Sequence, residues 1–215
     1  MLGYSVIVDE EPRGRLESPR LTREQIVDVA LTLFSERGYR GTTIDDIGRA
    51  AGVRGPSLYH HVGSKQEILA DVMLGVMDSL LADHRDAIAR TSDVTEQLRL
   101  AIEAHVRYHA RHRREAFVGN REIGSLEQPS RSFFLGKRDD YERALRAILD
   151  RGAAEGHFDP EHTRLASYAI LDMGVGVATW FRPDGSVPED EVVRRYGELA
   201  MRIAARSGAG GGPTN

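Results

Sequence analysis

Hydrophobic residues recur along this chain at helical spacing, and strand-like alternation of polar and apolar positions is absent. The first such run places Ile26, Ala30 and Phe34 on one face, with Thr22 before it and Gly38 after it. An amphipathic helix presents one apolar stripe to a core, and glycine commonly ends a helix. This run therefore predicts a helix from Thr22 to Gly38.

A second, shorter helix is predicted directly after the first. Asp46 follows Thr43 by three residues, so the threonine hydroxyl can cap the free N–H groups that open a helix. Ile44 and Ile47 then fall on one face of that helix. Gly52 can adopt a positive φ at no steric cost, so it ends the helix and allows a sharp turn.

A third helix is predicted from Ser57 to Val62, just after Pro56, which suits a first helical turn. Leu58 and Val62 are four residues apart and would anchor it inward. Because so short a helix buries only two apolar side chains, its use is to present its outer face. Two helices around a glycine turn are typical of a helix-turn-helix that enters the DNA major groove, although an ordinary αα-corner has the same spacing.

The rest of the chain predicts longer helices, separated by breaks that contain proline or glycine. The first of them begins at Ser64, where Glu67 would complete a capping box. Its length would make it a rigid lever between the front of the chain and the remainder. We expect an all-α protein with about nine helices. The six longer ones are predicted at residues 64–90, 94–111, 113–124, 130–155, 160–181 and 189–206.

The pattern also divides the chain into four parts. Residues 1–20 contain prolines among mixed charges and are expected to form a flexible arm, while the glycine-rich residues 207–215 are expected to be a disordered tail. Between them we expect a helix-turn-helix DNA-binding domain at residues 21–66. A larger helical domain would then occupy residues 67–206.

Composition excludes several classes of protein. The 215 residues contain no cysteine, which rules out disulfides, a thiol nucleophile and thiolate metal sites. The N-terminus lacks the basic start of a signal peptide, and the longest apolar stretch, 168–181, contains Asp172 and is too short to span a bilayer. We therefore expect a cytoplasmic protein without a membrane partner. The net charge is −4, but residues 20–65 carry seven basic and five acidic side chains, which suits a few placed phosphate contacts.

From Thr22 to Lys65 the chain resembles the N-terminal domain of TetR-family transcriptional regulators. The resemblance is long and runs in order through several motifs. Val62 stands where the family usually has phenylalanine, a smaller anchor that leaves the outer face of the third helix intact. The matching positions are Ile26, Ala30, Leu33, Phe34, Gly38, Tyr39, 42–44, Ile47, 50–53, 57–61, Lys65, Ile68 and Leu69.

This resemblance implies a transcriptional regulator, not an enzyme, which binds double-stranded DNA at a palindromic operator. It implies a homodimer, because one short recognition helix supplies too little affinity, and the last two long helices are the expected interface. A hydrophobic effector would release the DNA, and no catalytic residue, cofactor or metal is expected. We expect a repressor, although an activator would have the same motifs. The expected DNA contacts are Arg54, Gly55 and Ser57 near base edges, Thr43, Tyr59, His60 and Lys65 at phosphates, and His61 at either.

The C-terminal half resembles actinobacterial repressors that control steroid-ring and lipid catabolism, at residues 154–160, 180–185 and Tyr196. This similarity implies an acyl-coenzyme A as the effector. Val175 and Thr179 stand where the steroid-ring repressor would have a larger aromatic and a basic residue, so its particular ligand is not carried over. A drug or secondary metabolite, with control of an efflux pump, is the alternative. An effector pocket needs an apolar body, and the candidates to line it are Met77, Leu81, Phe117, Arg121, Phe133, Phe134, Tyr168, Met173 and Trp180.

A metal site is the alternative from another class of protein. His105, His109 and His112 recur at i, i+4 and i+7 on one predicted helix face, the spacing of histidine metal ligands. No nucleophile, paired catalytic base or phosphate-binding loop accompanies them. A metalloenzyme that uses these histidines would contain bound metal when purified.

Overall fold

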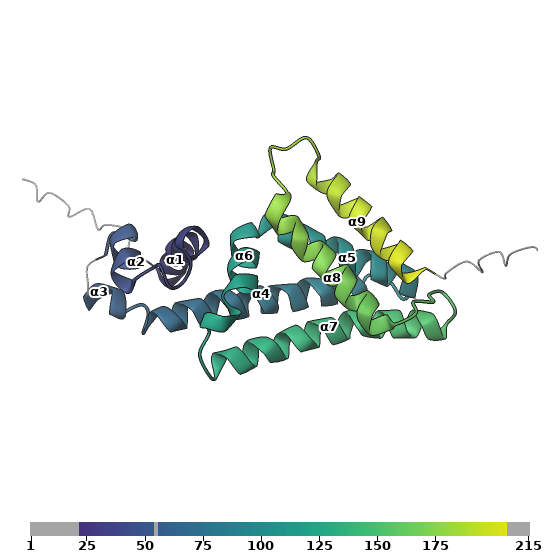
Figure 1. Ribbon diagram of the computed structural model, residues 1–215, viewed down its shortest axis with the longest axis horizontal. Helices are drawn as coiled ribbons and strands as arrows, with labels where there is room; N and C mark the ends of the chain where they lie inside the picture. Colours follow the sequence, from purple (N-terminus) through teal and green to yellow (C-terminus); the bar gives the residue numbers. More distant parts are fainter. Residues whose placement is uncertain (1–21, 54–55, 206–215) are drawn as a thin grey trace, which may run out of the picture.

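The computed structural model describes residues 22–53 and 56–205, and these residues form helices and connecting turns without a strand (Figure 1). The prediction of an all-α fold is confirmed. The predicted arm at 1–20 and tail at 207–215 lie outside the described residues. Within the described ranges the helices are α1 (Arg23–Arg37), α2 (Ile44–Ala50), α3 (Pro56–Tyr59), α4 (Lys65–Ile88), α5 (Val94–Arg111), α6 (Arg113–Arg121), α7 (Ser130–Ala154), α8 (Thr163–Trp180) and α9 (Glu189–Ala204), with a 3₁₀ turn η1 (Ile123–Ser125) after α6.

Local capping explains why the predicted helix ends lie close to the observed ones. Thr22 and Thr43 each accept a hydrogen bond from the backbone three residues on and complete a capping box at the start of α1 and α2. Gly38 and Gly52 have φ values of 77° and 73°, which other residues rarely adopt. At Ser64 only half of the predicted capping box forms, because the Glu67 carboxylate accepts from the Gly63 N–H instead.

The third helix is shorter than predicted. It begins at Pro56 and ends at Tyr59, after which the His61 N–H donates to the Leu58 carbonyl over 2.9 Å in a tighter, 3₁₀-type turn. Leu58 and Val62 are both buried, as their spacing predicts. Two apolar anchors therefore hold α3 and the turn after it against the core.

The helices form a head and a body joined by α4 (Figure 1). Helices α1–α3 lie at one end, and α4 runs from them along the body, where it packs against α5, α6 and α7. One apolar core joins α1–α3 to α4 and includes Val118 and Phe134 of the body. A second core lies among α5, α7, α8 and α9. Since the first core crosses residue 66, the predicted boundary there does not separate two independently packed cores.

None of the described helices is both long enough and apolar enough to cross a membrane.

Candidate functional site

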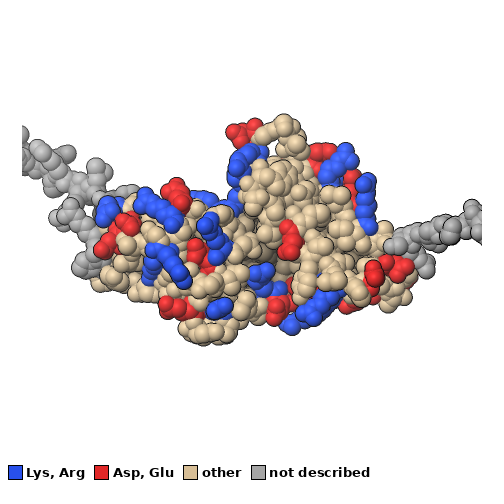
Figure 2. All heavy atoms as spheres, in the orientation of Figure 1, with Lys and Arg blue, Asp and Glu red and all other residues tan. Residues whose placement is uncertain are grey.

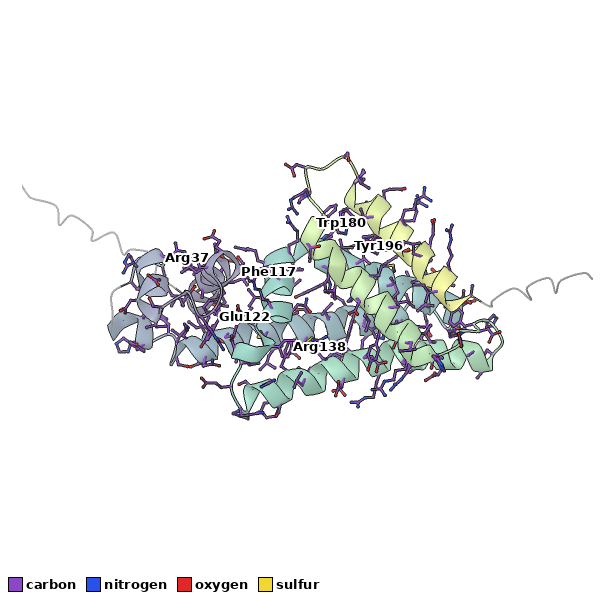
Figure 3. All side chains as sticks on the ribbon, viewed as in Figure 1. Arg37, Phe117, Glu122, Arg138, Trp180 and Tyr196 are labelled. Carbon is purple, nitrogen blue, oxygen red and sulfur yellow. The ribbon has the colours of Figure 1, made fainter. Side chains whose placement is uncertain are left out.

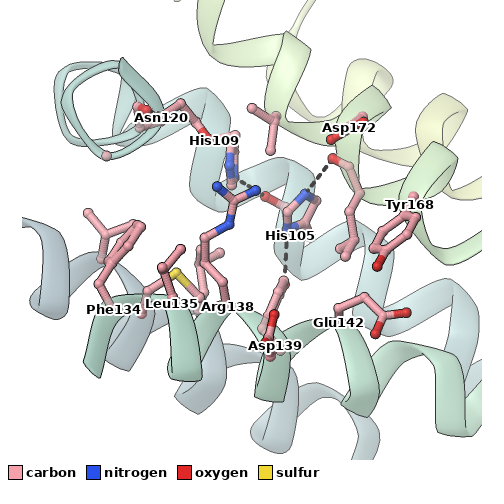
Figure 4. Close-up of a pocket in the computed structure, with 18 residues that line it drawn as sticks. His105, His109, Asn120, Phe134, Leu135, Arg138, Asp139, Glu142, Tyr168 and Asp172 are labelled. Carbon is pink, nitrogen blue, oxygen red and sulfur yellow. Dashed lines mark hydrogen bonds between the residues drawn. The ribbon is translucent and has the colours of Figure 1, made fainter. Parts of the chain in front are cut away.

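The body contains a cavity of about 300 Å³ surrounded by α4, α5, α6, α7 and α8 (Figure 4). This volume is at the lower end of the range for small-molecule pockets. One part of the wall is apolar, formed by Val76, Met77, Leu80, Phe134, Leu171 and Val175. The polar part is formed by His105, His109, Asn120, Arg138, Asp139, Tyr141, Glu142 and Asp172.

The cavity brings together three of the nine residues expected to line an effector pocket, namely Met77, Phe134 and Tyr168. The other six lie elsewhere. Leu81 and Met173 pack against the two apolar cores. The remaining four expected lining residues are exposed: Phe117, Arg121, Phe133 and Trp180. Helical spacing identifies apolar positions but does not say which of them face a cavity.

His105 forms the centre of a buried hydrogen-bond network that the sequence did not reveal. Its Nε2 lies 3.1 Å from the Leu171 carbonyl oxygen and its Nδ1 lies 2.9 Å from the Tyr141 hydroxyl (Figure 4). A carbonyl can only accept, so Nε2 carries the proton and Nδ1 accepts from the Tyr141 O–H. Burial, and then the neighbouring His109, hold the pKa of His105 well below its usual value, so the ring is neutral.

His109 lies one turn further along α5 and lines the same cavity. Its Nδ1 is 3.1 Å from the His105 carbonyl oxygen, to which it donates. Burial lowers the pKa of His109 to about 4, which leaves this ring neutral at physiological pH. The two imidazoles pack with their ring centres 4.4 Å apart.

The third histidine of the alternative metal site is not part of this arrangement. His112 stacks on Tyr108, with ring centres 4.5 Å apart, and its Nδ1 lies 3.6 Å from Glu115. It does not line the cavity. Across residues 22–53 and 56–205, no group of three or more histidine, aspartate or glutamate side chains is placed to hold a metal ion.

The head presents the polar face of α3 to solvent. Ser57, Tyr59 and His60 are exposed, and 56% of the Tyr59 surface is accessible. Basic and acidic side chains are intermingled over this end of the molecule (Figure 2). The His61 carbonyl accepts from Arg23, which also pairs with Asp71 and so fixes the end of the α3 turn to α1 and α4. Two of the expected DNA contacts, Arg54 and Gly55, lie outside the described residues.

Two further expected DNA contacts have partners within the protein. The Thr43 hydroxyl lies 2.6 Å from the Asp46 carboxylate and 3.1 Å from its backbone nitrogen, so it caps α2. The Lys65 ammonium donates to the carbonyls of Tyr39 and Thr42 over 2.9 Å and 2.7 Å and lies above the Tyr39 ring. Desolvation lowers the pKa of Lys65. These contacts make Lys65 a brace for the α1–α2 turn.

A short polar contact joins the cavity wall to the head. Gly119 and Asn120 of α6 line the cavity, and Glu122 follows directly at the point where α6 meets the head (Figure 3). The buried Glu122 carboxylate accepts from the Tyr39 backbone N–H at 3.1 Å and from the Ser125 hydroxyl at 2.7 Å. Gln66, at the start of α4, donates to the Ser125 carbonyl at 2.7 Å. The end of α6 is thus hydrogen-bonded to both α4 and the α1–α2 turn.

The two parts of the chain match two family models. Residues 26–72 match the bacterial regulatory proteins of the tetR family, and residues 91–204 match the tetracyclin repressor-like C-terminal domain. The chain belongs to the TetR family. Members of this family are transcriptional regulators, and both matches agree with the head and body described above.

Individual relatives support the same assignment. The HTH-type transcriptional repressor KstR2 of Rhodococcus jostii is 32% identical over 182 residues, which cover 83% of this chain and 89% of the relative. The structure of the ketosteroid transcriptional regulator KstR2 of Mycobacterium tuberculosis superposes with a TM-score of 0.79 and 28% identity, over 90% of this chain and 98% of that one. AibR, solved with isovaleryl coenzyme A and operator DNA, shares the fold at 22% identity, with a TM-score of 0.75 over 82% of this chain and 96% of that one.

Proposed function

We propose that this TetR-family regulator is a repressor that binds a palindromic operator as a homodimer and releases it when an acyl-coenzyme A enters the α4–α8 cavity. The observation that carries this proposal is that one helix, α6, both lines the cavity and is hydrogen-bonded to the head. An effector shifts an equilibrium only through contacts that differ between two states. A ligand against Gly119 and Asn120 acts on the helix that positions the α1–α2 turn.

The cavity and the relatives favour a short acyl thioester. The cavity volume of about 300 Å³ suits a compact apolar group rather than a long chain. Arg138 lines the cavity and has no hydrogen-bond or ion-pair partner within the described part of the chain, so its guanidinium is available to a carbonyl or a phosphate. AibR shows that this fold holds both isovaleryl coenzyme A and operator DNA.

The DNA-reading surface in this proposal is the outer face of α3. In this scheme Arg54, Gly55 and Ser57 contact base edges, and Tyr59 and His60 contact phosphates. His61 would serve at either. Lys65 contributes in this scheme by bracing the α1–α2 turn, since its ammonium already donates to Tyr39 and Thr42. Thr43 likewise contributes through the start of α2.

The proposed dimer interface is the outer face of α8 and α9. Trp180 and Tyr196 lie together where these helices meet, with ring centres 6.3 Å apart (Figure 3). Large apolar side chains on the same two helices are exposed in the single chain: Leu165, Tyr168, Trp180, Leu199 and Ile203. Two helices from each protomer would bury these groups in a four-helix bundle. Sedimentation equilibrium of Leu199→Glu, with Val187→Glu on the α8–α9 loop as control, tests this surface, and a Leu199→Glu protein that remains dimeric contradicts it.

The decisive experiment measures fluorescence anisotropy of the full chain on its own upstream DNA. The complex is titrated with free coenzyme A and with acyl-coenzyme A thioesters of increasing chain length. Release by short thioesters at concentrations where free coenzyme A has no effect is the expected result. Tight DNA binding that no thioester disturbs would keep the DNA-binding regulator and remove the proposed ligand. Affinity for the operator should fall for Tyr59→Ala, whose exposed ring the fold does not require.

A further inference from the structure

The Nε2 atom of His109, in the cavity wall, has no hydrogen-bond partner among the described residues. His109 is 2% exposed, and its Nδ1 donates to the His105 carbonyl. A neutral imidazole carries one proton, so with Nδ1 protonated the Nε2 atom has only a lone pair. Among the described residues nothing donates a hydrogen bond to this nitrogen. Because this residue lines the cavity, the Nε2 lone pair is open to a ligand that carries a donor.

We propose that the effector of this chain carries a hydroxyl group, which donates a hydrogen bond to His109 Nε2 inside the cavity. The inference rests on the proposed function, because it assigns a chemical feature to the ligand of the same site. It adds a requirement that an unsubstituted acyl chain does not meet. Such a chain would fill the apolar wall and leave the Nε2 lone pair unpaired.

The remaining polar groups of the wall favour a donor at this place. Asn120 uses its amide N–H to donate to the Ala116 carbonyl over 2.8 Å, which leaves its side-chain oxygen as an acceptor. The Tyr141 hydroxyl is committed to His105 Nδ1. Glu142 already accepts from Ser167 at 2.6 Å. The Asn120 side-chain oxygen and the Glu142 carboxylate can accept further hydrogen bonds, which a ligand hydroxyl can donate.

Arg138 is the charged donor on the wall. In the view of Figure 4 its guanidinium overlaps the His109 ring, and among the described residues no hydrogen bond joins the two side chains. A hydroxyl can donate to His109 and accept from Arg138 at the same time. A methylene at that position can do neither, so the two residues together select a hydroxylated ligand over its unsubstituted analogue.

The first test concerns the protein without ligand. Long-range ¹H–¹⁵N correlation spectra of the histidine rings distinguish a protonated from a bare imidazole nitrogen. For the full chain at pH 7 we expect a bare Nε2 and a protonated Nδ1 at His109, assigned by comparison with His109→Phe. A protonated Nε2 would overturn the inference whatever the protein binds.

The second test separates the hydroxyl from coenzyme A. Benzyl alcohol and ethylbenzene have nearly the same shape and are small enough for a cavity of about 300 Å³. Calorimetric titrations of both compounds are made with the native chain, with His109→Phe and with His112→Phe, which alters an exposed histidine outside the cavity. We expect His109→Phe to weaken benzyl alcohol relative to ethylbenzene by about tenfold, as for the loss of one buried hydrogen-bond partner. His112→Phe should leave the ratio unchanged.

The third test uses the thioesters themselves. Hexanoyl-coenzyme A is compared with its 3-hydroxy and 6-hydroxy counterparts in release of the operator complex. A preference of about tenfold for one hydroxylated thioester, lost in His109→Phe, supports both proposals. Failure of all thioesters together with a hydroxyl preference in the aromatic pair removes the acyl-coenzyme A effector and keeps the hydroxyl. Equal affinity ratios for the aromatic pair in the native chain and in His109→Phe overturn the hydroxyl inference.

Discussion

The head and the cavity side of the body treat polar groups in opposite ways. In the head, the buried Thr42 hydroxyl donates to the Gly38 carbonyl at 3.0 Å, and Lys65 and Arg23 each donate to two or more acceptors. Beside the cavity, His84 Nε2 is buried without any partner, and His109 Nε2 also has none among the described residues. A reading surface gains from a single rigid arrangement, whereas a binding site keeps unpaired groups for its ligand.

Acidification should have the largest effect on stability, because it charges the unpaired histidines beside the cavity. Burial lowers the pKa of both His84 and His109 to about 4. The unfolded chain binds these protons near pH 6.5 and the folded chain does not, so stability is complete above pH 6.5 and is lost as the pH falls toward 4. Each ring should remove about 3 kcal/mol from the free energy of unfolding by pH 4. Urea unfolding at a series of pH values measures this loss.

A variant isolates the contribution of one histidine. His84→Leu removes a buried ring whose Nε2 has no partner, so it should reduce the slope of stability against pH between 6.5 and 4 by the share of one group. His112→Phe, which alters an exposed ring, is the control and should leave the slope as it is. Identical slopes for the native chain and His84→Leu would show that this ring does not stay neutral.

A single methyl group on α8 should have the next largest effect. A Cβ at Gly174 would lie 2.2 Å from His105 Cδ2, and the His105 ring cannot move without losing its bonds to Tyr141 and Leu171. Gly174→Ala should therefore lower the free energy of unfolding by about 2–3 kcal/mol and weaken effector binding. Gly136→Ala on α7, where a Cβ meets nothing within 4 Å, should instead raise it by up to about 1 kcal/mol. Thermal and urea denaturation of both variants measure the difference.

Loss of the contact between body and head should lower stability more modestly. Glu122→Met leaves the buried Tyr39 N–H without its acceptor, at a cost of about 1–2 kcal/mol. Because the same contact joins α6 to the head, the effector concentration needed to release DNA should also rise. Glu127→Met changes an exposed carboxylate in the same loop and is the matched control. Glu122→Gln retains an acceptor and should restore most of the stability, and equal effector responses in all three variants would exclude this route of coupling.

The fold could be predicted in detail because its signals are local. Capping threonines, positive-φ glycines and the Leu58–Val62 pair act within a few residues, so they are visible in the sequence. The site could not be predicted, because its geometry comes from partners that are distant in the sequence. His105 and His109 have the spacing of metal ligands, yet what orients His105 is a hydroxyl 36 residues away and a carbonyl 66 residues away. Phe133 and Trp180 looked like lining residues because apolar character does not distinguish a cavity from a surface.

The smallest expected effect concerns the salt dependence of DNA binding in Lys65→Met. A lysine that neutralises a phosphate contributes about 0.9 to the slope of log affinity against log salt. The Lys65 ammonium is already directed at the Tyr39 and Thr42 carbonyls, so its loss should cost about 1 kcal/mol of stability and leave the slope unchanged. Lys137→Met, which removes a body lysine paired with Asp78, supplies the baseline slope. A slope smaller than that baseline by about 0.9 per protomer would show that Lys65 contacts a DNA phosphate. The head would then resemble the cavity, since both would hold a polar group whose partner is supplied by the ligand.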